Sequence, residues 1–136
     1  MSRVNHIAAW VAAIVQFIFG ALWYSALGHT WMRAIGKTEA ELAPDRNSPL
    51  PYMFALGSAL IVAYLIAWLL PRVDAESAAA GAKVGATLAL SLIATTLATN
   101  YGFEGRSFSL WIINTGHMLF GMAAMGAIIG AWRMKA

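Results

Sequence analysis

Four long stretches of the chain contain no charged side chain: residues 4–30, 47–71, 84–103 and 107–132. A helix needs about 20 apolar residues to cross about 30 Å of hydrocarbon, and each stretch can hold them. Only helices and closed barrels satisfy their own backbone in lipid, and these stretches lack the alternating pattern of barrel strands. The pattern therefore predicts four transmembrane helices, at about residues 4–27, 52–70, 76–100 and 109–132.

The connection between the first two predicted spans has a helical pattern of its own. Trp31, Met32 and Ile35 fall on one side of a short helical turn, which is typical of a segment lying along a membrane surface. Thr38 and Glu41 then match the T-x-x-E capping box that begins a helix. We therefore expect a short amphipathic interfacial helix here.

Composition agrees with a membrane location. The chain is 60% hydrophobic and 11% charged, whereas soluble domains are about 25% charged. Its net charge of +3 lies in loops and termini, which suits contact with membrane lipids and is too small to favour nucleic acid. We expect one all-α domain over residues 1–136, an integral membrane four-helix bundle.

Basic residues divide almost evenly between the two sides of the predicted bundle. One side has Arg3, Arg72, Lys83, Arg133 and Lys135, and the other has Arg33, Lys37, Arg46 and Arg106. The small excess favours both termini in the cytoplasm. A nearly equal number of basic residues on the two sides also suits an antiparallel dimer. We therefore expect a homo-oligomer, with a dimer favoured.

Polar side chains inside the predicted spans share particular helix faces. At about 100° per residue, Gln16 lies on a stripe of small residues, and Asn114 and His117 share a face with Trp111. His117 lies about 10 Å below the turn between the third and fourth spans. These positions predict a cleft in one half of the bilayer, lined by Gln16, Trp23, Tyr24, Thr95, Asn100, Trp111, Asn114 and His117, with Trp31, Glu104 and Arg106 at its mouth.

Each of these polar features also has a purely structural interpretation. His117 can be a hydrogen-bond partner of Gln16 or Asn114 across helices. Glu104 and Arg106 can form an exposed ion pair, or Arg106 can bind an anionic headgroup or substrate. Hydroxyl groups recur every four residues in the third span, where each can bond the carbonyl one turn back: Thr87, Ser91, Thr95 and Thr99. Two G-x-x-x-G motifs, Gly81 with Gly85 and Gly126 with Gly130, favour close packing of helices.

Few kinds of chemistry fit these residues. The chain has no cysteine, and His6 and His117 lie about 20 Å apart in depth, so we expect no metal site and no cofactor. All six acids lie in loops or at helix ends, which disfavours proton-coupled export through a membrane-embedded carboxylate. His117 as a base for Ser91 or Thr95 is an alternative that no nucleophile motif supports, so the sequence favours a protein that is not an enzyme.

Two segments, GALWYSALGHTWMRAIGKTEAEL and ATNYGFEGRSFSLWIINTGHMLFGMAAMGAIIGAW, resemble a group of small bacterial membrane proteins, the domain of unknown function 1761. The shared positions are Trp23, Tyr24, Ser25, Trp31, Met32, Asn100, Phe103, Glu104, Gly105, Arg106, Trp111, Asn114 and His117. The resemblance implies four membrane helices in a bacterial inner membrane. It implies no activity.

The sequence thus leads to one expectation and two alternatives. The expected function is to bind or pass a small molecule or lipid in the predicted cleft, as a transporter or channel does. The alternatives are an intramembrane enzyme that uses His117 as acid and base, and an assembly module without a ligand.

Overall fold

A computed structural model describes residues 3–132. Arg133 and Lys135, two of the basic residues expected on one side of the bundle, lie outside the described residues. The regular elements are all helical, and they run in the order α1 His6–Ala26, α2 Gly28–Ile35, α3 Glu39–Asn47, α4 Leu50–Leu69, the 3₁₀ turn η1 Leu70–Val73, α5 Ala78–Leu88, the π-helical turn η2 Ala89–Ala94, α6 Thr95–Glu104 and α7 Phe108–Ala131.

Four helical segments are long and apolar enough to cross a membrane: His6–Ala26, Leu50–Val73, Ala78–Glu104 and Phe108–Ala131. They overlap the four spans expected from the sequence and indicate a multi-pass membrane protein. The third continues to Glu104, past the predicted end at residue 100. The helix ends at Glu104 because the next residue, Gly105, has φ +67°, the left-handed conformation that commonly ends a helix.

Local sequence signals explain where the helices begin. Asn5, Ser77 and Ser107 each accept a hydrogen bond from a backbone N–H in the first turn of the helix that follows. The capping box predicted at Thr38 and Glu41 is confirmed, with both reciprocal hydrogen bonds present. The donated bonds hold the pKa of the Glu41 carboxyl below its usual range.

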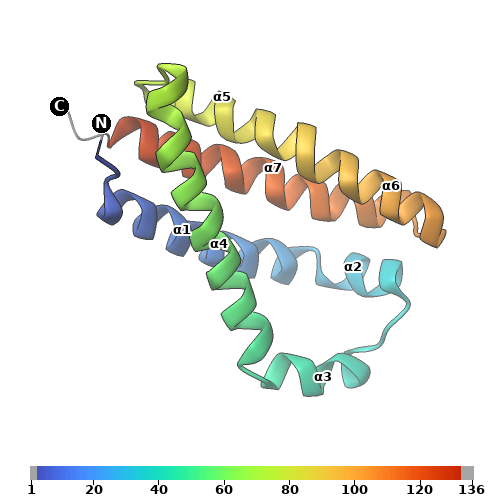
Figure 1. The fold of residues 1–136 in the computed structure, drawn as a ribbon. Helices are drawn as coiled ribbons and strands as arrows, with labels where there is room; N and C mark the ends of the chain where they lie inside the picture. The colour runs from blue at the N-terminus through green and yellow to red at the C-terminus, as the bar shows by residue number, and fades with distance from the viewer. Residues whose placement is uncertain (1–2, 133–136) are drawn as a thin grey trace.

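Helix α7 lies at the centre of the arrangement, with α5 and α6 along one side and α1 along another, while α4 crosses over α1 (Figure 1). The core against α1 and α4 consists largely of alanines, including Ala9, Ala12 and Ala63, none of which is exposed. Trp10 and Ile14 on the other face of α1 are exposed. The small-residue stripe predicted on the first span therefore packs inward, as close helix contacts in lipid require.

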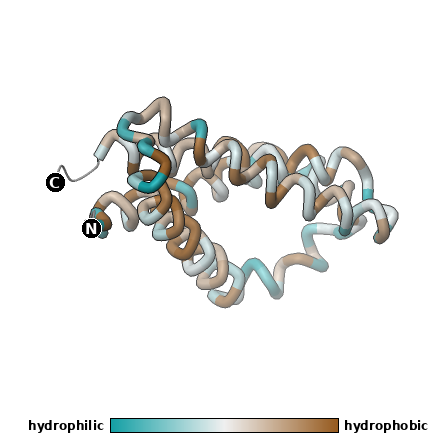
Figure 2. The backbone as a smooth tube through the Cα atoms, turned by 45° about the horizontal axis from the view of Figure 1, so that its top comes forward, coloured by the Kyte–Doolittle hydropathy of each residue, from teal (hydrophilic) through white to brown (hydrophobic). Residues whose placement is uncertain are grey.

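Helix α4 packs on the other candidate spans through its second half. Ala59, Ala63 and Ile66 are buried, whereas every residue from Leu50 to Ala55 is exposed. Figure 2 shows apolar residues along α4 and hydrophilic residues near α3 and near the connection from α4 to α5. The first half of α4 is thus an apolar helix that no other described span covers.

Helix α2 is amphipathic, and its apolar residues Trp31, Met32 and Ile35 are half-buried. It packs on α7 and α1, and the Trp31 ring meets the Tyr24 ring edge-on, with centroids 5.9 Å apart. Protein therefore covers part of the apolar surface that the sequence predicted would face lipid.

Helices α5 and α7 approach each other most closely through the α5–α7 glycine contact, formed by Gly81, Gly85, Gly126 and Gly130. A Cβ atom on Gly81 would overlap the carbonyl oxygen of Gly126, and one on Gly126 would overlap that of Gly81. The two G-x-x-x-G motifs predicted as packing contacts thus pack within one chain, backbone on backbone.

Candidate functional site

Gln16 and His117 meet near the middle of α1 and α7, which lie side by side (Figure 1). The Gln16 Nε2 lies 3.4 Å from the His117 Nε2, so the amide donates when the imidazole proton is on Nδ1. Gln16 is only 6% exposed, and its Oε1 has no hydrogen-bond partner among the described residues. Gly121 leaves the space for this amide, because a Cβ atom there would overlap Oε1.

Aromatic rings enclose the half-buried imidazole of His117. The Phe19 ring stacks on it, with centroids 5.7 Å apart and planes 13° apart, and the Tyr24 ring meets it edge-on at 5.2 Å. Gly20 completes the surround, because a Cβ atom there would lie 2.9 Å from the His117 Nε2. Side chains of α1 therefore occupy much of the space around the imidazole.

Two linked hydrogen bonds join α1, α7 and α6 at Asn114, which lies one helical turn from His117 toward the α6–α7 connection. The Tyr24 hydroxyl donates to Asn114 Oδ1 over 2.7 Å, and Asn114 Nδ2 donates to the Tyr101 hydroxyl over 2.8 Å. Asn114 thus joins α1 to α6 through both ends of its amide. We call Gln16, Tyr24, Tyr101, Asn114 and His117 the polar cluster.

Two tryptophans bond to backbone carbonyls beside the polar cluster. The Trp23 indole donates to the Ile113 carbonyl over 3.0 Å, and Gly116 leaves room for its ring. The Trp111 indole donates to the Ala94 carbonyl over 2.9 Å, at the last residue of η2. Both rings are thereby fixed by contacts between helices.

The structure brings together five of the eight residues predicted to line the cleft: Gln16, Trp23, Tyr24, Asn114 and His117. Thr95 and Asn100 are exposed on α6, and Trp111 faces a separate pocket. The hydroxyls of Thr87, Ser91, Thr95 and Thr99 each donate to the carbonyl four residues earlier, which is the structural alternative stated from the sequence.

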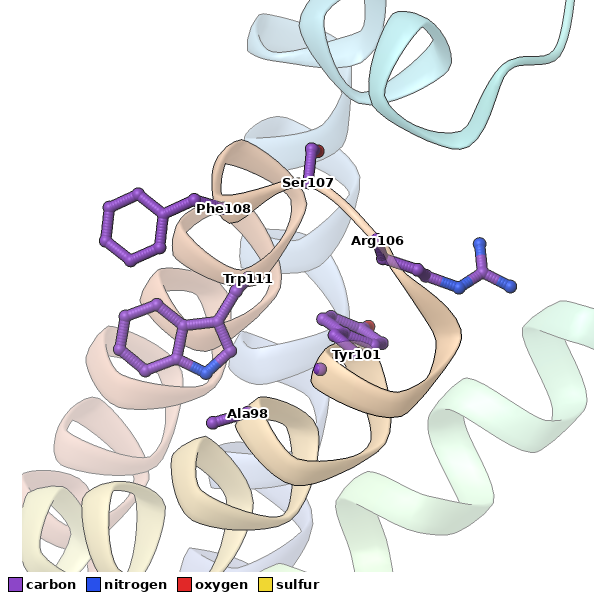
Figure 3. A pocket seen from close by; sticks show the side chains of 7 residues that line it. Ala98, Tyr101, Arg106, Ser107, Phe108 and Trp111 are labelled. Atoms are coloured by element: carbon purple, nitrogen blue, oxygen red, sulfur yellow. The ribbon is translucent and has the colours of Figure 1, made fainter.

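A pocket of about 300 Å³ lies between the end of α6 and the start of α7, and we call it the α6–α7 pocket. Figure 3 shows the Phe108 and Trp111 rings on one side of it and Tyr101 on the other, with Arg106 extending outward from the turn. The Phe108 and Trp111 rings stack at 5.5 Å. The pocket is lined by Ala98, Tyr101, Gly102, Arg106, Ser107, Phe108 and Trp111.

Glu104 and Arg106 form an ion pair at the rim of this pocket, with the Arg106 Nε 2.5 Å from the Glu104 Oε2. Both side chains are about half exposed, and Gly105 gives the turn that brings them together. The bond and the carboxylate charge raise the pKa of the Arg106 guanidinium. Trp31, the third residue predicted at the mouth, lies on α2 against Tyr24.

Sequence reasoning missed Tyr101, which belongs to both the polar cluster and the α6–α7 pocket. It also missed the pocket residues Ala98, Gly102, Ser107 and Phe108. The signal for Tyr101 is its place directly after Asn100, but the predicted third span ends at residue 100, so Tyr101 falls outside that span. Among residues 3–132, no group of three or more His, Asp or Glu side chains converges as a metal site would require.

Comparison with known proteins places the chain in a family without assigning it a function. No curated protein and no solved structure matches it. The model of the family described as "Protein of unknown function (DUF1761)" matches residues 7–130, which confirms the resemblance seen in the sequence motifs. The chain therefore belongs to the DUF1761 family.

Proposed function

We propose that the chain is a multi-pass protein of the bacterial inner membrane that binds one small amphiphilic molecule, such as a lipid, in the α6–α7 pocket. The pocket itself is the observation that supports this proposal. Its volume of about 300 Å³ lies at the lower end of the range for ligand sites, about 300–1,000 Å³, and suits a short apolar group.

The position of the pocket also favours an amphiphile. The turn at Gly105 to Ser107 joins two candidate spans. In a membrane we therefore expect the pocket to open near the level where hydrocarbon meets headgroups. Aromatic rings of Phe108 and Trp111 offer an apolar wall, and the charged pair lies outside that wall. An apolar group in the pocket would thus leave its polar end beside the ion pair.

The polar cluster supports the second candidate, an assembly module, for that part of the molecule. Asn114 is bonded at both ends, and the Gln16 amide meets His117, so these side chains bond mainly to each other. The enzyme alternative lacks comparable support, because the Ser91 and Thr95 hydroxyls donate to carbonyls of their own helix. Passage of a ligand through the bundle and the expected dimer stay predictions.

Filling the pocket tests the proposal. Gly102 lines the pocket and a Cβ atom there meets nothing within 4 Å, so Gly102→Leu should occupy the cavity without a clash at the backbone. Gly57→Leu in α4 is the matched control, because Gly57 is also helical with nothing within 4 Å of a Cβ atom.

Native mass spectrometry of purified protein titrated with a phospholipid gives the readout. We expect the wild type and Gly57→Leu to retain one lipid at similar concentrations, and Gly102→Leu to need about tenfold more, equivalent to about 1.4 kcal/mol. Thermal unfolding in detergent checks that both variants fold. Equal lipid binding by folded Gly102→Leu and wild type would refute the site.

A further inference from the structure

The Glu104–Arg106 pair has a structure that suggests a role in binding, provided that the proposed function holds. Arg106 is one of the residues that line the α6–α7 pocket, and Figure 3 shows its side chain pointing outward from the turn. Only Nε is bonded to Glu104. Among the described residues, neither Nη1 nor Nη2 donates a hydrogen bond to protein.

Glu104 takes the Nε donor of Arg106, which is one of the guanidinium donors that an external anion would use. Its carboxylate lies 2.5 Å from the guanidinium Nε, yet it is about half exposed and comes from only two residues away. Exposed ion pairs of this kind contribute little to stability, so their partners exchange easily. A phosphate ester is a strong partner for an arginine, because the planar guanidinium can donate two parallel bonds to it.

We propose that Glu104 is an internal competitor for an anionic phospholipid: its carboxylate holds Arg106 in the free protein and gives way to the lipid phosphate when the apolar part of the lipid enters the pocket. The substrate class is therefore a phospholipid with a net negative headgroup. A zwitterionic phospholipid binds more weakly, because the positive charge on its headgroup nitrogen reduces the net negative charge near the Arg106 guanidinium.

Opposite effects of two neighbouring substitutions test this proposal. Phosphatidylglycerol and phosphatidylcholine with identical acyl chains are titrated by native mass spectrometry. For the wild type, phosphatidylglycerol should bind more tightly. Glu104→Gln removes the competitor and should tighten phosphatidylglycerol binding by up to about fivefold, the range set by the strength of an exposed ion pair. Arg106→Gln should reduce it to the level of phosphatidylcholine.

Glu39→Gln on α3 is the control for net charge, because it removes one negative charge outside the pocket and should leave the ratio between the two lipids unchanged. Weaker or unaltered phosphatidylglycerol binding by Glu104→Gln would overturn the competitor role. If all variants bind both lipids equally while Gly102→Leu still loses them, this inference fails and the proposed pocket stands. If Gly102→Leu also binds like the wild type, the proposed function fails.

Discussion

The two halves of α7 are held in different ways. From Met122 to Gly130 the helix lies backbone to backbone against α5 and the residue before it, with carbonyl oxygens where side chains would otherwise be. From Phe108 to Met118 it is held by side chains of α1 and α6, through aromatic rings and hydrogen bonds.

This difference explains where a pocket can exist. Backbone contact fills space completely and is stabilised by many weak van der Waals contacts, so it leaves no room for a ligand. Side-chain contact keeps the helices farther apart, and the space between them depends on how each ring is placed. The α6–α7 pocket lies in the half that uses side chains, beside Trp111 and Tyr101.

The largest expected effect comes from adding one methyl group to the α5–α7 glycine contact. Gly126→Ala puts a Cβ atom into the Gly81 carbonyl, where neither backbone can move without separating the helices. We expect a destabilisation of about 3 kcal/mol, as for severe overpacking of a core. Thermal or denaturant unfolding in detergent measures it.

Gly57→Ala is the control for this change, because its Cβ atom meets open space. It should stabilise the protein by about 0.5–1 kcal/mol through better helix propensity. Similar stability of the two variants would contradict the distinction between the two halves of α7, because it would show that α5 and α7 are not held at backbone distance.

A smaller effect is expected at Gly121, where the two halves of α7 meet. Gly121→Ala overlaps the Gln16 amide rather than backbone, so a side chain can yield. We expect about 2 kcal/mol of destabilisation. In the Gln16→Ala background the same change should cost less than about 0.5 kcal/mol, since the overlapping group is gone. Additive losses in the double variant would show that the strain lies in the backbone, as at Gly126.

Much of the fold could be predicted from the sequence because its signals are local. Stretches without charge predicted the four candidate spans, and Thr38 with Glu41 predicted the capping box. The G-x-x-x-G motifs predicted the close helix contacts. Helix periodicity also placed Asn114 and His117 on one face.

The site was harder to predict because it depends on how faces of different helices meet. Thr95 belongs to a polar stripe, but its hydroxyl is satisfied within its own helix, so polarity alone did not reveal that it lies outside the cluster. Tyr101 was missed for the opposite reason. Its role depends on the extension of α6 to Glu104 and on its distance from Asn114, and neither can be calculated from spacing along the chain.

The smallest effect tests the hydrogen-bonded chain in the side-chain half of α7. Tyr24→Phe removes the donor to Asn114 Oδ1 and keeps the ring that meets His117. Hydrogen bonds between membrane helices are worth about 0.6 kcal/mol on average, and we expect a loss of that size in unfolding measurements. Asn114→Leu in both backgrounds completes a double-mutant cycle, and a coupling near zero would contradict the bond. Because Tyr101 and the pocket walls are unchanged in Tyr24→Phe, its lipid affinity should equal that of the wild type. A parallel loss of lipid would instead show that the bond to α1 helps to hold the pocket open.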